Sequence, residues 1–109
     1  MLDRKSALDR VGGDEELLRE IARLFLGEYP KDLAEIHRAI EVGNAQDLER
    51  AAHSLKGAVA NFSADQTRDA AFRLEQIGKS GNLGEARAAR QVLEQSLSDL
   101  KPFLEAIAE

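Results

Sequence analysis

One stretch decides the fold of this chain: Ala51-Ala-His-Ser-Leu-Lys-Gly-Ala-Val-Ala-Asn-Phe-Ser-Ala64. In a helix that turns about 100° per residue, the apolar side chains in and just before this stretch fall in one narrow sector. They are Leu48, Ala52, Leu55, Val59 and Phe62. At the same spacing His53 lies about 140° from the centre of that sector. The pattern therefore predicts a helix that packs one side against a core and exposes His53 on the other.

The face around His53 carries one cation and two small residues. Lys56, Gly57 and Ala60 follow the histidine at i+3, i+4 and i+7, the spacing of neighbours on a helix surface. A glycine inside a helix costs about 1 kcal/mol relative to alanine, and close approach of another surface would offset that cost. Two alternatives remain open: Gly57 marks a helix end, or it allows tight packing inside the molecule.

The composition indicates one soluble globular domain spanning residues 1–109. The chain is 43% hydrophobic and 32% charged, which suits a chain able to bury a core. It contains no cysteine, so disulfides and thiolate metal sites are excluded. No apolar run approaches the roughly 20 residues that cross a bilayer, and we expect a cytoplasmic location. The net charge of −5 without a basic stripe argues against a nucleic-acid partner.

Turn residues divide the first half of the chain into helices. A short helix is expected from Asp3 to Val11, followed by the turn Gly12-Gly13. Asp14 is positioned to cap a second, long helix. Pro30 lies within this helix, where it removes one backbone donor and crowds the preceding turn. We expect one helix kinked at Pro30 rather than two helices.

The second half of the chain predicts three more helices. The histidine helix begins at Asn44 or Asp47 and ends near Phe62. Ser63 and Asp65 offer caps for the following helix. The end of that helix is marked by Gly78, Gly81 and Gly84. The last helix is expected to begin at about Leu83 or Glu85 and to end at Ile107.

Apolar residues recur at helical spacing along the long and the last helix. The expected core positions are Leu17, Ile21, Leu24, Phe25, Leu33, Ile36, Ile40, Val92, Leu93, Leu97, Leu100, Phe103, Leu104 and Ile107. Pro102 is a candidate for a bend in the last helix. Four amphipathic helices with short loops predict an all-α, antiparallel up-down four-helix bundle with a short additional N-terminal helix. Such a bundle encloses its apolar faces without a second chain, so we expect a monomer.

The stretch around the histidine resembles a known family. His53-Ser-Leu-Lys-Gly57 followed by Ala60-Asn-Phe-Ser-Ala64 is similar to the signature of histidine-containing phosphotransfer (HPt) domains, a His-x-Leu-Lys-Gly run followed by an Asn-Leu-Gly-Ala-like run. The residues Gly12 to Leu18 resemble the opening of the family, and Gly43-Asn44-Ala45 resembles the turn before its histidine helix. Nearly the whole chain is covered, with one departure at Ser63, where the family usually has glycine.

The resemblance implies a carrier in a two-component phosphorelay with the same bundle fold. His53 would accept a phosphoryl group from the phosphoaspartate of a receiver domain and pass it to another receiver aspartate. Lys56 would balance phosphate charge, and Gly57 would leave room for the phosphoryl group. The partners would be response-regulator receiver domains, either with a free chain or with a hybrid sensor kinase in cis, which is membrane-bound in some cases. Each receiver would supply the magnesium ion, so the chain needs no cofactor or metal of its own.

A docking surface is expected around His53. Its candidates are Gln46, Glu49, Arg50, Ala60, Glu75 and Lys79. Glu49 and Glu75 either orient the imidazole or are simply solvated, and we favour solvation because charged residues are mostly exposed. Lys79 lies near the histidine if the two helices are antiparallel, but it also suits the end of its own helix.

Other functions find less support in the residues. His37 precedes Glu41 by four residues, but two ligands without a third are weak evidence for a metal, and we expect a surface histidine. The chain has no glycine-rich phosphate-binding loop, so it is not expected to be an autonomous kinase. The alternative to a phosphoryl carrier is a non-catalytic helical-bundle adaptor that binds a receiver domain or another signalling partner.

Overall fold

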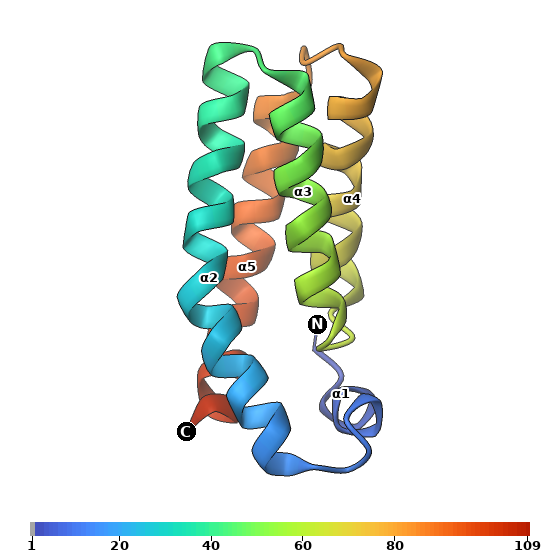
Figure 1. Cartoon of the computed structure of the whole chain (residues 1–109), viewed down its shortest axis with the longest axis vertical. Coiled ribbons are helices and arrows are strands. Elements are labelled where there is room, and N and C mark those ends of the chain that lie inside the picture. Colours follow the sequence, from blue (N-terminus) through green and yellow to red (C-terminus); the bar gives the residue numbers. More distant parts are fainter. Residues whose placement is uncertain (1) are drawn as a thin grey trace.

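The computed structural model describes residues 2–109, and within them the chain forms five helices. These are α1 (Arg4–Arg10), α2 (Glu15–Val42), α3 (Ala45–Ala60), α4 (Asp65–Ser80) and α5 (Ala86–Ala108). Figure 1 shows α2 to α5 running alternately up and down side by side, with α1 at one end of the bundle. The predicted all-α, antiparallel four-helix bundle with a short N-terminal helix is confirmed.

Side-chain caps begin the first three helices. In each case the oxygen of the capping residue accepts a hydrogen bond, 3.0 Å long, from the backbone N–H three residues later, which would otherwise lack a partner. The caps are Asp3, Asp14 and Asn44. Asn44, and not Asp47, therefore starts the histidine helix α3, so this boundary is fixed by local chemistry alone.

The start of α4 differs from the prediction. Ala64 precedes the helix without a side-chain cap, so the expectation that Ser63 or Asp65 caps it is wrong. Ser63 instead adopts φ 52°, a left-handed conformation that favours glycine. Its hydroxyl accepts a hydrogen bond of 3.1 Å from Nε of Arg10. This contact joins the end of α1 to the turn between α3 and α4.

The long helix α2 passes through Pro30 without interruption, as the prediction of a single helix required. Figure 1 shows the ribbon changing direction in the first half of α2. Pro30 lies just past the middle of α2. Because proline removes one backbone hydrogen bond and crowds the turn before it, a change of direction is expected in that preceding turn.

The core is a stripe along each helix, and two predicted core positions of α2 lie outside it. Leu18, Ala22 and Phe25 are buried, whereas Leu17 and Leu24 are 41% and 67% exposed. The buried residues recur at i, i+4 and i+7, so a leucine one position earlier points about 100° away from them. Val92 and Phe103 of α5 were also expected in the core and are likewise exposed.

Within residues 2–109, no helix has the length and apolar composition to span a lipid bilayer.

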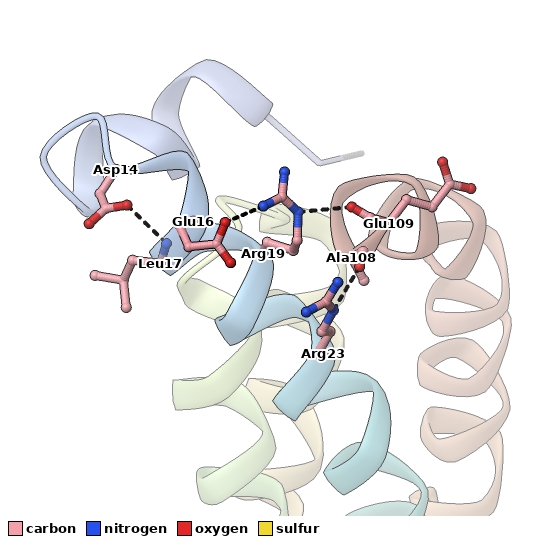
Figure 2. Close-up of polar contacts among 7 residues, drawn as sticks. All are labelled: Asp14, Glu16, Leu17, Arg19, Arg23, Ala108 and Glu109. Carbon is pink, nitrogen blue, oxygen red and sulfur yellow. Dashed lines mark hydrogen bonds and ion pairs between the residues drawn. The ribbon is translucent and has the colours of Figure 1, made fainter.

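Two arginines of α2 anchor the end of α5, as Figure 2 shows. Nε of Arg19 donates to the carbonyl oxygen of Glu109 over 2.8 Å, and Nε of Arg23 donates to that of Ala108 over 2.9 Å. The last carbonyls of a helix have no partner inside it, and a cation there also opposes the negative end of the helix dipole. The end of α5 is therefore fixed to α2 by charge-assisted hydrogen bonds.

Gly78 brings α3 and α4 into backbone contact. A Cβ atom added at Gly78 would lie 2.6 Å from the backbone nitrogen of Glu49 and 2.8 Å from the carbonyl oxygen of Ala45. Of the three glycines expected to mark the end of this helix, Gly81 does so as the left-handed cap with φ 76°, whereas Gly78 lies inside α4, which continues to Ser80. Gly78 is a packing residue that sets how α4 lies along α3.

We expect Gly78→Ala to lower the free energy of unfolding by about 1 to 3 kcal/mol, because the methyl group meets backbone that has to shift. Gly57→Ala is the matched control, since a Cβ at Gly57 meets nothing within 4 Å and alanine is the better helix former by up to about 1 kcal/mol. Urea unfolding monitored by circular dichroism measures both. Equal stability of the two variants would contradict the close contact at Gly78.

Candidate functional site

His53 lies on the outer side of α3, as its helical position predicts. Its side chain is 67% exposed. The apolar residues predicted for the opposite side of the helix, from Leu48 to Phe62, are all fully buried. The imidazole is therefore presented to solvent by a helix whose other side is fixed in the core.

One carboxylate joins His53 to Lys56. Oε2 of Glu75 lies 3.0 Å from Nδ1 of His53, and Oε1 lies 2.7 Å from Nζ of Lys56. Glu75 is only 7% exposed, so the favoured interpretation of Glu75 as a solvated charge is wrong. The antiparallel packing of α3 and α4 places Glu75 beside the histidine. Its Oε2 is in a hydrogen bond with the imidazole and its Oε1 is in an ion pair with Lys56.

The charge state of Glu75 determines which ring nitrogen of His53 is free. Burial raises the pKa of the Glu75 carboxyl, but the hydrogen bonds and charges of Lys56 and His53 outweigh burial and hold this pKa below its ordinary value. An ionised carboxylate only accepts hydrogen bonds, so Nδ1 carries the proton that it donates to Glu75. In the neutral imidazole, the lone pair then resides on Nε2.

Phe72 belongs to the same cluster and was missed in the sequence. Nζ of Lys56 lies 4.9 Å from the centre of the Phe72 ring, a favourable position for a cation over an aromatic face. Phe72 is 44% exposed because it lies off the buried stripe of α4. An aromatic residue outside the apolar stripe, one turn before Glu75, was the available sequence signal.

A shallow depression of about 560 Å³ surrounds the imidazole between α3 and α4. It is lined by Gln46, Glu49, Arg50, His53, Glu75 and Lys79. These include five of the six residues predicted for the docking surface. Ala60 lies two turns beyond His53 and does not line the depression. Two cations, Arg50 and Lys79, thus share this hollow with the histidine.

Gly57 lies inside α3 without a close packing neighbour among the described residues. The helix continues three residues beyond it to Ala60, and a Cβ added there would meet nothing within 4 Å. Both alternatives for this glycine, a helix end and tight internal packing, are therefore wrong. Gly57 leaves open space on the helix surface one turn after His53.

The second histidine provides a contrast. His37 is exposed on α2, which confirms the expected surface histidine, and its Nδ1 contacts a guanidinium nitrogen of Arg90. A guanidinium donates and never accepts, so His37 faces an arginine where His53 faces a carboxylate. Among residues 2–109, no group of three or more His, Cys, Asp and Glu side chains is arranged to hold a metal ion.

Comparison with known proteins identifies related sequences and folds. The sequence profile of the Hpt domain matches residues 20–103, which include every residue of the depression. No curated protein sequence matches the chain. Among solved structures, histidine-containing phosphotransfer protein B (HptB) from Pseudomonas aeruginosa PAO1 is similar, with a TM-score of 0.88 and 24% identity over 96% of this chain and 91% of that chain. At this identity the similarity establishes the shared fold.

The ionised Glu75 makes stability depend on pH. Its folded pKa lies below the ordinary 4.5, so its contribution is complete above that value and is lost as the pH falls through the folded pKa. We expect Glu75→Gln to lower the free energy of unfolding at pH 7 by about 1 to 2 kcal/mol. The deficit should shrink as the pH falls below 4.5. Urea unfolding at a series of pH values tests this, and a deficit that stays constant down to acid pH would exclude an ionised Glu75 as its cause.

Proposed function

This chain belongs to the Hpt domain family, and on that premise we propose that His53 is the residue that carries the phosphoryl group. Histidine phosphotransfer in a phosphorelay is the function of the domain, which acts as a phosphocarrier for the receiver domains of response regulators. The observation that supports His53 is its exposed imidazole, whose Nδ1 is held by Glu75.

The geometry suits a direct transfer between aspartate and histidine. The lone pair on Nε2 of His53 attacks the phosphorus of the receiver's aspartyl phosphate, and a nitrogen–phosphorus bond forms. The bond from phosphorus to the aspartate oxygen breaks, and its electron pair leaves with the carboxylate. The ring keeps its Nδ1 proton and becomes positively charged. Glu75 accepts the hydrogen bond from Nδ1 and balances this charge, and donation to the next receiver reverses each step.

Glu75 and Lys56 act in this proposal as positioning residues. The hydrogen bond to Glu75 fixes the tautomer and the ring plane of His53, so the nucleophilic nitrogen needs little reorganisation. The ion pair with Lys56 keeps the nearly buried carboxylate charged. Lys56 therefore supports the phosphoryl group mainly by preserving the ionised partner of the histidine.

The partner completes the reaction centre. We expect the receiver domain to bring its acidic pocket and a magnesium ion, which neutralises charge on the transferred group. This chain then has to offer an accessible nitrogen and room for a second surface. Gly57 provides the room on α3, and the depression next to it provides the contact area. The chain needs no nucleotide site for such a role.

A phosphotransfer assay tests the proposal with a built-in control. Phosphorylated receiver domains should label the wild-type chain and His37→Gln, whereas His53→Gln should show no acid-labile label, because His53 presents an exposed imidazole whose Nδ1 is held by Glu75. Mass analysis of the labelled peptide locates the group. Equal labelling of His53→Gln would move the site elsewhere. Binding of a receiver without any labelling would support the adaptor alternative.

The open space at Gly57 gives a separate test of docking. We expect Gly57→Gln to keep the fold, since its side chain enters solvent, but to slow transfer from a receiver about tenfold or more, because a misplacement of about 1 Å can cost a factor of about 100. Labelling by the small donor phosphoramidate should change much less. Unchanged transfer from receivers would show that no partner surface approaches α3 at Gly57.

A further inference from the structure

The contacts of His53 do not identify the side chain that neutralises a phosphoryl group attached to it. A phosphoryl group carries a charge of about −1.5 to −2 at neutral pH. Resting on the phosphoryl-carrier function of His53, we propose that Arg50 is the residue that holds the phosphoryl group on Nε2. Lys56 remains with Glu75.

The orientation of the His53 ring argues against a phosphoryl group on the side that faces α4. Nδ1 of His53 points to Glu75 on α4, and the two ring nitrogens of an imidazole face different directions. Nε2 therefore faces away from the carboxylate, and a phosphoryl group bonded to it lies on the outer side of α3. The cations that can serve this group have to reach that outer side.

Lys56 is already engaged on the other side of the ring. Its ammonium group lies 2.7 Å from Glu75 and over the ring of Phe72, and its side chain is only 25% exposed. Moving Lys56 to the phosphate would leave Oε1 of a nearly buried carboxylate without its cation, which is unfavourable. Lys56 is thus better suited to holding Glu75 than to holding the phosphate.

Arg50 is on the outer side of α3 and is held only weakly. It precedes His53 by three residues, so the two side chains are neighbours on the helix surface. It lines both the depression around His53 and the adjoining one between α2 and α3, so it lies on the ridge of α3 between these two hollows. Its side chain is 77% exposed, and among residues 2–109 its one ion pair is with Asp47 over 3.2 Å. Exposed pairs of this kind are weak, and a guanidinium binds phosphate oxygens in pairs.

Lys79 is the competing candidate. It lines the same depression from α4 and makes no ion pair within the described residues. Arg50 differs from Lys79 in sharing a helix with His53, so its distance from Nε2 does not depend on the packing of two helices.

Phosphorus NMR of chains labelled with phosphoramidate tests the assignment without any receiver. A cation beside the phosphate favours the dianion, so we expect the phosphate of Arg50→Ala to titrate at a higher pH than in the wild type. With a receiver present, the transfer equilibrium of Arg50→Ala should shift about two- to fivefold toward the receiver. Arg50→Lys should recover part of both effects. Arg87→Ala is the control, because Arg87 is similarly exposed and paired with Glu41 on another face.

The outcomes separate this inference from the function on which it rests. A normal titration and equilibrium in Arg50→Ala, with the shift appearing in Lys79→Ala or Lys56→Ala, would overturn the role of Arg50 and leave His53 as the carrier. A wild-type chain that accepts no label from phosphoramidate or from receivers would overturn both the role of Arg50 and the carrier function of His53. The same shift in Arg87→Ala would show a general charge effect and also overturn the assignment.

Discussion

The contact of Gly78 with the backbone of α3 is the constraint on which the rest of the site depends. With no side chain at this position, α4 lies against the first two turns of α3 at a distance that a Cβ would prevent. Two antiparallel helices in such contact have one register. That register places Glu75 opposite His53 and Phe72 opposite Lys56. The site is therefore assembled by helix packing and needs no dedicated loop.

The nearly buried charge of this site is the carboxylate of Glu75. A nearly buried carboxylate is unfavourable unless its oxygens are paired, and Glu75 meets that condition by binding a cation and an imidazole at once. The same two contacts lower its pKa and select the tautomer of His53. His37 has a different neighbour, because its Nδ1 faces an arginine and not a carboxylate.

Local features could be predicted from the sequence, and features that depend on pairs of helices could not. The exposed position of His53, the buried sector opposite it and the caps at Asp14 and Asn44 follow from helical periodicity and backbone chemistry. The roles of Glu75 and Gly78 depend on the register of α3 against α4, which no single helix encodes. Periodicity also placed Leu24 in the core, whereas the structure buries the next residue, Phe25, and exposes Leu24.

In the proposed mechanism, Nε2 of His53 both receives the phosphoryl group and gives it up. A donor receiver and an acceptor receiver then have to occupy the site in turn. Traffic through such a carrier follows ping-pong kinetics. A spent donor that stays bound delays the next acceptor, and an excess of either receiver without phosphate acts as an inhibitor. The ratio of the two receivers, and not only their affinities, then sets how fast a signal passes through the relay.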